Sequence, residues 1–511
     1  MTPRSFLRSA FRRPPFLRQD LAASLVVFLV AVPLCVGIAV ASGAPAELGL
    51  VTGIVGGLVT GLLPGSSLQV SGPAAGLTVL VHQAVTTYGL PALGAVVLAA
   101  GVLQVAMGVL RLGRWFRAIS VSVVQGMLAG IGLVLIAGQL YPMLGAQARS
   151  SAMADLAGLP ALLAHTAGSP RALTAAAIGG GALLVLLGWR WLPARVRAVP
   201  GPLAAVVLAT AVTAAAGLDV ATVEVHGLLA SVQPPGLSDL ERLAGTGLLG
   251  TAVAFALIAS AESLFSAAAV DRLHNGPRTH YDRELVAQGV GNTVCGLLGA
   301  LPMTAVIVRS ATNVHAGART RLSRVLHGCW LLLFAALLPA ALGMIPLAAL
   351  AAVLVHAGAK LVPVAALRPL WQAHRGEAVV LVVTAVAVTA TNLLEGVLLG
   401  LLLAVVKSAW ETSHLKVEVV EAAEAVEGPA APILVRLSGN ATFLRLPGML
   451  GALETLPQGR PVTLDLADLL HVDHACRTAL HDWAARREGE AEGEAEGGAE
   501  GEAESVRVPT P

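Results

Sequence analysis

The sequence predicts an α-helical, polytopic membrane protein of fourteen transmembrane segments, followed by a small α/β domain. Of the 511 residues 56% are hydrophobic and only 13% are charged, which is about half the charged fraction of a typical soluble domain. Apolar runs of about the length of a membrane-spanning helix recur from Asp20 to about Trp410. Beyond Trp410 the composition becomes polar. The net charge of +2 gives no indication of a nucleic-acid partner, because the basic residues lie in short loops.

Seven segments are predicted in the first half of the membrane domain, at about residues 20–216. Pro33 and Gly37 lie inside the first segment, and Gly43-Ala-Pro45 turns the chain after it. The predicted segments are Asp20–Ser42, a second that ends near Leu63, Leu68–Gln83, Pro91–Arg111, Arg117–Tyr141, a sixth between Pro170 and Trp189, and Pro200–Ala216.

Seven more segments are predicted in the second half, at about residues 246–411. A polar connector, Asp219 to Glu241, separates the two halves. The predicted segments are Thr246–Val270, a ninth after Glu284, Leu301–Gly317, an eleventh after Arg324, a twelfth that ends near Lys360, Glu377–Thr391 and Leu393–Trp410.

Segments three and ten share one design and are too short to cross a membrane as continuous helices. In each, an extended lead and a proline, Pro73 or Pro302, precede a half-helix. A half-helix that begins inside the bilayer leaves amide N–H groups unpaired and places a positive dipole end near the midplane, which favours an anion. Segment ten also carries Arg309, and a charge at that depth costs roughly 3 kcal/mol. We therefore expect Arg309 to face a cavity or a partner.

The basic residues predict that both termini lie in the cytoplasm. With the N terminus inside, every arginine-rich loop also falls inside. The basic residues 1–19 are interpreted as a cytoplasmic arm and not as a signal peptide. Segments three and ten lie seven apart, so the two halves have opposite orientations. This predicts a 7+7 inverted repeat with the binding site where the two broken helices meet.

A small α/β domain is predicted at residues 412–487, after the membrane domain of residues 20–411. Strands are expected at 432–437 and 461–466, and helices at 440–456 and 476–487. Residues 488–511 begin with a repeat of Glu, Gly and Ala and are expected to be disordered. The four cysteines have neither metal nor disulfide spacing, so no metal and no cofactor is expected.

Three stretches resemble the SulP (sulfate permease) family of anion transporters. They are DLAASLVVFLVAVPLCVGIAVASGAP, VSGPAAG and ELVAQGVGNTVCGLLGALPMTAVIVRSATNVHAGARTRLS. The tail resembles the STAS domain of that family through VTLDLADLLHVDHACRTALHDW. The resemblance implies a core and a gate domain, an anion held between the N termini of segments three and ten, and an elevator-like shift of the core.

The STAS-like tail departs from its family at one turn. Val472-Asp-His-Ala-Cys476 stands where STAS domains often have an Asp-Ser-Ser-Gly-type turn. Since the phosphorylatable serine is missing, we expect a docking or dimer-supporting role in place of regulation by phosphorylation.

The expected anion site combines backbone amides with one fixed positive charge. Arg309 supplies the charge; the alternatives are that it pairs with Glu262 or reaches the inner surface. Small side chains in segments three and ten let an anion approach the amides, although helix packing alone also explains small residues. The predicted substrate-binding residues are Ser71, Gly72, Ala74, Ala75, Val308, Arg309 and Ser310.

Glu262 and Ser266 are the predicted ion-coupling residues. Glu262 is a carboxylate inside segment eight, in the stretch ASAESLFSAAAVD. The resemblance implies an acid there that couples transport to protons or sodium. Ser266 lies one turn further on the same helix face. A purely structural ion pair with Arg309 is the alternative.

The expected function is secondary active transport of a small inorganic oxyanion, sulfate first, across the cytoplasmic membrane. H⁺ or Na⁺ is the expected coupling ion, and a homodimer in the lipid bilayer is the expected assembly. Leu34 and Ile38 stand where some relatives have a glutamine and an aromatic residue, so the anion stays open. The alternatives are a bicarbonate or C4-dicarboxylate symporter of the same fold, an uncoupled anion channel and a non-transporting receptor. No enzyme constellation or nucleotide motif is present.

Overall fold

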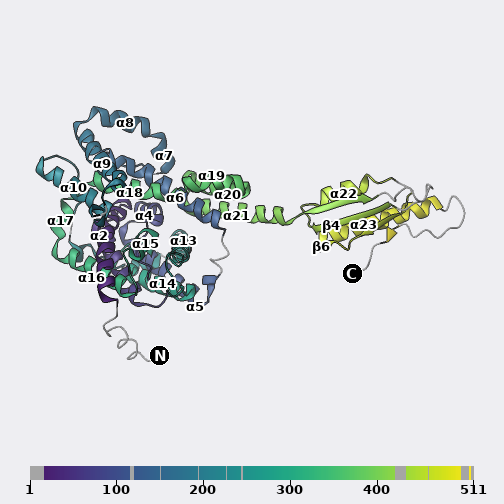
Figure 1. Ribbon diagram of the computed structural model, residues 1–511, viewed down its shortest axis with the longest axis horizontal. Helices are drawn as coiled ribbons and strands as arrows, with labels where there is room; N and C mark the ends of the chain where they lie inside the picture. Colours follow the sequence, from purple (N-terminus) through teal and green to yellow (C-terminus); the bar gives the residue numbers. More distant parts are fainter. Residues whose placement is uncertain are drawn as a thin grey trace, which may run out of the picture. The chain divides into compact units, whose positions relative to one another are not determined.

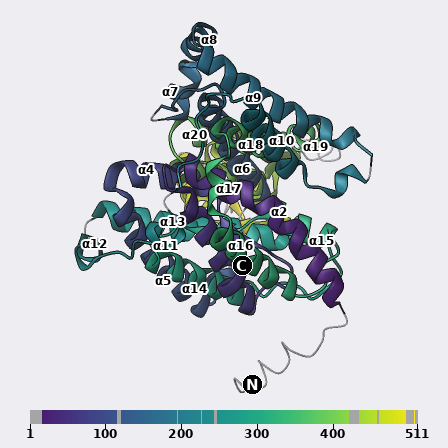
Figure 2. The same cartoon turned by 90° about the vertical axis from the view of Figure 1, so that its left-hand side faces the viewer.

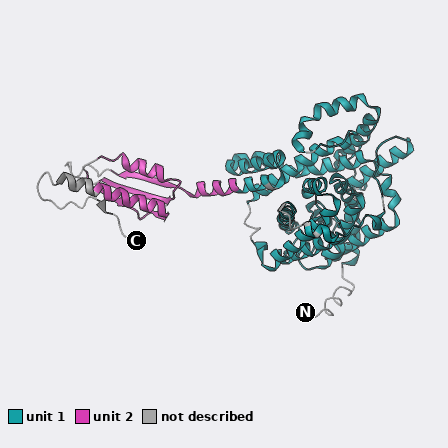
Figure 3. Ribbon diagram, turned by 180° about the vertical axis from the view of Figure 1, so that it is seen from behind, with its two compact units in different colours: residues 1–401 teal, residues 402–511 magenta. Residues whose placement is uncertain are grey.

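The computed structural model describes residues 16–114, 120–149, 151–193, 195–225, 227–242, 246–420, 433–457, 460–495 and 506–507. Contacts divide the chain into two units, residues 1–401 and 402–511 (Figure 3). The first unit is a bundle of helices, and the second contains a small β-sheet with helices (Figure 1).

Each of the fourteen predicted membrane segments corresponds to a helix or a broken helix. In the first half they are α2 (Leu17–Ala41), α3 (Ala46–Val55) with the π-helical η1 (Gly56–Thr60), α4 (Thr78–Tyr88), α5 (Leu90–Val109), α6 (Val121–Met143), α9 (Pro170–Gly188) and α10 (Gly201–Ala215). In the second half they are α13 (Thr246–Val270), α14 (Tyr281–Leu297), α15 (Ile307–His315), α16 (Leu322–Leu337), α18 (Leu347–Leu361), α20 (Arg375–Ala390) and α21 (Leu393–Thr412). The expected start of segment five, Arg117, lies outside the described residues.

Helix lengths vary more than the sequence suggested. Among the described residues, six helices are long and apolar enough to span a membrane, and three further apolar helices are shorter. The connections also form short helices that the sequence analysis did not predict. These are α7 (Ala152–Ala157), α8 (Leu159–Gly168), α11 (Leu228–Ser231), α12 (Leu237–Arg242), α17 (Pro339–Gly343) and α19 (Val364–Ala373).

The packing of the helices repeats between the two halves. Helix α2 packs on α16, and its counterpart α13 packs on α5. Helix α3 also packs on α16, and its counterpart α14 also packs on α5. Helices α14 and α5 lie side by side in Figure 2. Helix α18 packs on α9, as α6 packs on α20, and α6 and α18 pack on each other. Exchanging each segment with the one seven positions later thus preserves these contacts, as expected for a 7+7 repeat.

The two broken segments meet as a pair of short antiparallel strands. Strand β1 (Ser71–Pro73) pairs with β2 (Met303–Ala305), and Gly72 lies opposite Thr304. Each strand precedes a half-helix: β1 leads through the 3-10 turn η2 (Ala75–Leu77) into α4, and β2 leads into α15. The pairing brings the beginnings of the two half-helices together.

Side chains satisfy the backbone around this pair of strands. The Asn292 amide accepts a hydrogen bond from the Met303 N–H at 2.7 Å and donates one to the Met303 carbonyl at 3.0 Å. The Ser310 hydroxyl accepts from the Val70 N–H at 2.9 Å. The Asn313 side chain donates to the Leu68 carbonyl at 2.9 Å. These bonds replace the helical ones that the interruption removes, as burial away from water requires.

Close helix crossings depend on glycine. At the contact of η1 with α16, a Cβ atom added to Gly57 would lie 2.5 Å from the Cα atom of Gly328. Small residues let two helix backbones approach, and in lipid that contact is a main source of association.

The C-terminal unit folds around a mixed sheet. Its strands are β3 (Leu415–Val420), β4 (Ile433–Ala441), β5 (Val462–Asp465), β6 (Leu469–Val472) and β7 (Val506–Arg507), in the order β3-β4-β5-β7 with β6 also paired to β4. Helices α22 (Leu446–Glu454) and α23 (His474–Ala495) complete it. The core includes Val435, Leu453 and Trp483.

This unit differs from the sequence-based expectation in its strands and in its last helix. Residues 415–420, for which no strand was predicted, form β3, which pairs with β4. Strand β6 was also not predicted, and β4 continues to Ala441, into the range expected to be helical. Helix α23 continues past Arg487 to Ala495, into the acidic segment that was expected to be disordered. Residues 496–505 and 508–511 lie outside the described part of the chain.

We expect Gly57→Ala to destabilise the membrane unit, because the new methyl group would overlap the Gly328 backbone. Overpacking of this kind costs about 1–3 kcal/mol. The melting temperature of the detergent-purified protein, followed by size-exclusion fluorescence, should fall. Gly180→Ala is the matched control, since a Cβ atom at that helical glycine meets nothing within 4 Å. Equal melting temperatures for the two variants would contradict the packing argument.

We expect Asp473→Ala to loosen the first turn of α23. The Asp473 carboxylate accepts hydrogen bonds from the amides of Cys476 and Phe443. Burial raises the pKa of Asp473, but these amide bonds outweigh it and hold the pKa below its ordinary value. Loss of such a cap costs about 1 kcal/mol, so amide hydrogen exchange in this turn should accelerate several-fold.

The same bonds predict a pH dependence. Because the pKa of Asp473 is lower in the folded state, its stabilising effect is present at neutral pH and is lost as the pH falls through the acid range. Exchange in the wild-type turn should therefore accelerate on acidification more than exchange in Asp473→Ala, after correction for the intrinsic rate. Asp482→Ala, at an exposed position of the same helix, should behave as wild type.

Candidate anion-binding site

A cavity lies where the two half-helices begin. The N-terminal ends of α15 and η2 line it, together with side chains of α2, α6, α13 and α18. The cavity therefore combines residues from both halves of the chain. Of the predicted site residues, it brings together Ala75, Val308, Arg309, Glu262 and Ser266.

Arg309 is fully buried in the first turn of α15. None of its three guanidinium nitrogens has a hydrogen-bond partner among the described residues. Its Nη1 atom lies directly against Gly72 of β1, where any side chain would overlap it. The neutral Cys35 thiol lies beside the guanidinium, and His327 is a second buried neighbour, so neither supplies a negative charge. A buried cation without a protein partner is costly, so this guanidinium is suited to an anion.

Arg309 is neither paired with Glu262 nor extended to the surface. No ion pair joins the two residues in the described structure, and the Arg309 side chain has no exposure. Both structural alternatives from the sequence analysis are therefore wrong for the arginine.

The half-helix ends add backbone donors to this charge. Val306, the residue before α15, donates its N–H to the Val70 carbonyl at 3.0 Å. The next three amides, Ile307 to Arg309, belong to the first turn, where a helix has no carbonyl to accept them. No side chain caps this end, and none caps η2. The positive dipole end of α15 thus faces the same space as the guanidinium.

Glu262 and Ser266 lie in the wall of the cavity, one turn apart on α13. The Glu262 carboxylate lies beside Gly76 of η2, and its Oε2 atom would be 2.8 Å from a Cβ atom there. The Thr304 hydroxyl and the Gly76 amide lie beside the carboxylate, and the buried Ser266 hydroxyl has no hydrogen-bond partner among the described residues. An acidic and a hydroxyl oxygen are therefore available for a proton or a small cation at the edge of the anion site.

Four predicted site residues lie behind the cavity and do not line it: Ser71, Gly72, Ala74 and Ser310. The Ser71 hydroxyl accepts a hydrogen bond from Gln288 at 2.7 Å. Ser310 bonds to the Val70 amide, as described above. Ser310 thus links the two broken segments, Ser71 ties β1 to α14, and Gly72 leaves room for Arg309. A direct contact of these four with an anion stays a prediction.

The sequence analysis missed two ionisable residues of the cavity. His356 and Lys360 lie one turn apart on α18 and line the cavity wall. Their presence in an apolar run was visible in the sequence and favours a functional position. Lys360 had been taken only as the end of segment twelve.

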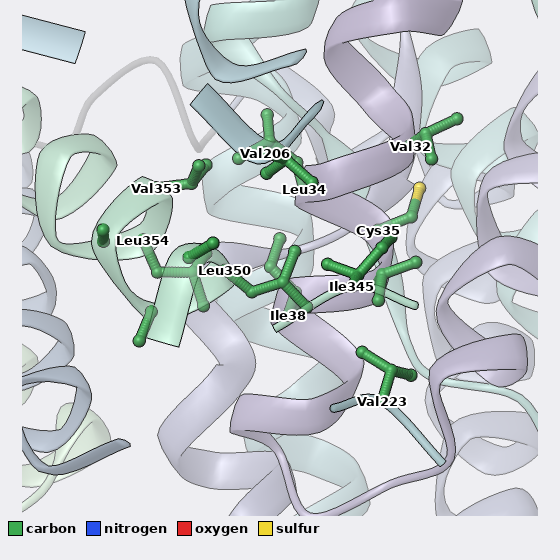
Figure 4. Close-up of a cluster of buried hydrophobic side chains, with 14 of the residues drawn as sticks. Val32, Leu34, Cys35, Ile38, Val206, Val223, Ile345, Leu350, Val353 and Leu354 are labelled. Carbon is green, nitrogen blue, oxygen red and sulfur yellow. The ribbon is translucent and has the colours of Figure 1, made fainter. Parts of the chain in front are cut away.

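The rest of the wall is apolar. Leu34 and Ile38 of α2 lie against Val353 and Leu354 of α18 (Figure 4), and all four also line the cavity. Val124, Met127 and other side chains of α6 complete it. This surface of α2 packs without hydrogen-bonding groups against α18.

A family model decides the relationship of this chain to known proteins. Residues 17–384 match the model of the sulfate permease family. The chain belongs to the sulfate permease family. The predicted fold class, a helical membrane unit followed by a C-terminal α/β unit, is confirmed. The protein is a multi-pass membrane protein of a transporter family.

Curated relatives cover most of the chain. It is 27% identical over 405 residues to the putative sulfate transporter YbaR of Bacillus subtilis, a match of 78% of this chain and 79% of that protein. It is 25% identical over 496 residues to the bicarbonate transporter BicA of Synechocystis sp., a match of 91% of this chain and 85% of that protein.

Solved structures share the fold. The transmembrane domain of a cyanobacterial bicarbonate transporter BicA matches with a TM-score of 0.64 and 24% identity, over 77% of this chain and 98% of that one. The murine anion transporter Slc26a9 in the inward-facing state matches with a TM-score of 0.73 and 15% identity, over 94% of this chain and 85% of that one.

We expect Arg309→Ala to weaken anion binding much more than it lowers stability, because no described residue depends on the guanidinium for a hydrogen bond. A hydrogen bond to a charged group contributes about 1.5–3 kcal/mol, or a roughly 10- to 100-fold loss of affinity. This loss of affinity is measured by equilibrium binding of labelled sulfate and bicarbonate to the purified protein. Arg283→Gln, an exposed arginine outside the cavity, is the control. Unchanged affinity in Arg309→Ala would exclude the proposed contact.

Proposed function

We propose that this protein is a secondary active transporter of a small inorganic oxyanion, with sulfate as the first candidate. The observation that carries the proposal is the fully buried, unpaired Arg309 at the start of a half-helix inside a cavity between the two halves of the chain. The relatives named as putative sulfate transporters support the choice of sulfate.

Bicarbonate is the second candidate, on two observations. The cavity wall beyond Arg309 and the half-helix ends is mostly apolar, and removing charge from water is costlier for a dianion than for a monoanion. The bicarbonate transporter BicA of Synechocystis sp. also matches nearly the whole chain. C4-dicarboxylates share the carboxylate chemistry and serve as a third test substrate.

Alternating access would proceed by movement of a core against a gate. The core would carry the two broken helices with α2 and α13, and the gate would include α6 and α18. The apolar contact between α2 and α18 supports this, since surfaces without directional bonds slide at low cost (Figure 4). The anion would travel with the half-helix ends and Arg309, while the gate stays fixed in the membrane.

Glu262 and Ser266 would bind the coupling ion. A proton or Na⁺ on Glu262 would neutralise a carboxylate beside Gly76, at the beginning of η2, and so favour entry of the anion. We propose that both termini are cytoplasmic, that the membrane is the cytoplasmic membrane and that the protein works as a homodimer. The arginine-rich loops support the orientation.

The test is uptake into proteoliposomes. Purified protein is reconstituted and supplied with labelled sulfate, bicarbonate or fumarate under an imposed proton or sodium gradient. Accumulation of one anion above its equilibrium level identifies both substrate and coupling ion. Absence of uptake for all three anions would refute oxyanion transport.

We expect Glu262→Gln to abolish accumulation while anion binding persists. Glutamine keeps the size of the side chain, but it cannot take up a proton and has no negative charge to bind a cation. Under a gradient, the internal anion should therefore rise only to its equilibrium level. If the wild type also reaches only equilibrium, and Glu262→Gln matches it, the protein is an uncoupled pathway. Glu395→Gln, outside the cavity, is the control carboxylate.

A further inference from the structure

A second hollow adjoins the central cavity. It is formed by the C-terminal end of α13, the beginning of α14 and the connection between them, with Arg114 and two residues of α6. Val124 of α6 and Phe265 of α13 line both the hollow and the central cavity. The two spaces are therefore neighbours that share two apolar side chains. An anion that passes between the central site and this face of the protein would cross this hollow.

The exposed charge of the hollow is positive. Arg114, Arg272 and Arg278 line it, and all three are exposed. None of them forms an ion pair in the part of the chain that the structure describes. One nitrogen of Arg278 donates to the backbone carbonyl of Asp271, which holds this side chain near the connection. His280 also lines the hollow and is exposed.

The acidic residues of the hollow are already engaged by the protein. Asp271 is 6% exposed and accepts from the amide and the hydroxyl of Thr279 at 3.0 and 2.8 Å. Asp282 accepts from the Gly113 amide at 2.9 Å. These carboxylates cap the local backbone and keep their negative charge, so the three arginines and two aspartates of the lining leave a net charge of +1. Guanidinium groups without carboxylate partners are suited to oxyanions.

We propose that this hollow is a vestibular oxyanion site, which binds the anion weakly before it passes Val124 and Phe265. The proposal rests on the proposed function of the central cavity. Converging positive charge at the mouth of a low-dielectric passage raises the local concentration of an anion by roughly tenfold or more, and salt screens the effect. Arg272 and Arg278 would be the main binding groups.

The test places a thiol in the hollow and measures charge selectivity without transport. Ala269→Cys, which lines the hollow, is introduced together with Cys329→Ser, because Cys329 is the exposed one of the native cysteines. The full-length protein in neutral-lipid nanodiscs reacts with an anionic and with a cationic methanethiosulfonate reagent. The ratio of the rate constant for the anionic reagent to that for the cationic reagent reports the local electrostatic potential.

We expect Arg272→Gln with Arg278→Gln to lower this ratio by about tenfold at low ionic strength, with a smaller effect in high salt. Arg272→Gln alone, at an exposed side chain, should give part of the effect without risk to folding. Arg283→Gln is the matched control, since Arg283 is exposed nearby but lines a different hollow. An unchanged ratio in the double variant would overturn the proposal.

Protection by sulfate tests binding as distinct from potential. At equal ionic strength, sulfate should slow the modification of Ala269→Cys more than chloride does. This protection should be the same with Arg309 and with Arg309→Ala, and it should be lost in the double variant Arg272→Gln with Arg278→Gln. Loss of protection in Arg309→Ala alone would place the sulfate in the central cavity and contradict a vestibular site. Protection that requires anionic lipid would assign the arginines to lipid headgroups and also contradict it. Because no step depends on transport, failure here is distinct from failure of uptake.

Discussion

The meeting of two interrupted helices is the constraint on which the rest of this structure depends. Inside a bilayer each unpaired backbone group must find a partner within the protein. Here β1 and β2 pair with each other, and Asn292, Ser310 and Asn313 supply the remaining bonds. Once this arrangement exists, the two half-helices must begin side by side. Their free amides then converge without any residue dedicated to that purpose.

The position of Arg309 follows from the same arrangement. Gly72 in β1 leaves room for the guanidinium, and α15 places it at the half-helix end. The result is a cation with no protein partner among the described residues, next to unpaired amides. A family of anion transporters is consistent with such a site. The apolar wall shared by α2 and α18 then gives a surface along which the site could be carried (Figure 4).

The passage beyond the site is charged differently from the site itself. The central cavity has one buried arginine, with Glu262, His356 and Lys360 in an otherwise mostly apolar wall, whereas the adjoining hollow has three exposed arginines. Val124 and Phe265 stand where the two environments meet.

The sequence by itself determined the membrane-helical class, the fourteen segments and the two interruptions, and it singled out Arg309 and Glu262 as candidate site residues. It did so because length, hydropathy and a charge within an apolar run are local properties. Only the tertiary structure decided that Arg309 and Glu262 do not pair, that the hydroxyls of Ser71 and Ser310 bond to Gln288 and to the Val70 amide, and that His356 and Lys360 line the cavity. These outcomes depend on which face each helix turns toward its neighbours. In a helix that is apolar all round, packing against other helices sets that face, and the residue pattern does not reveal it.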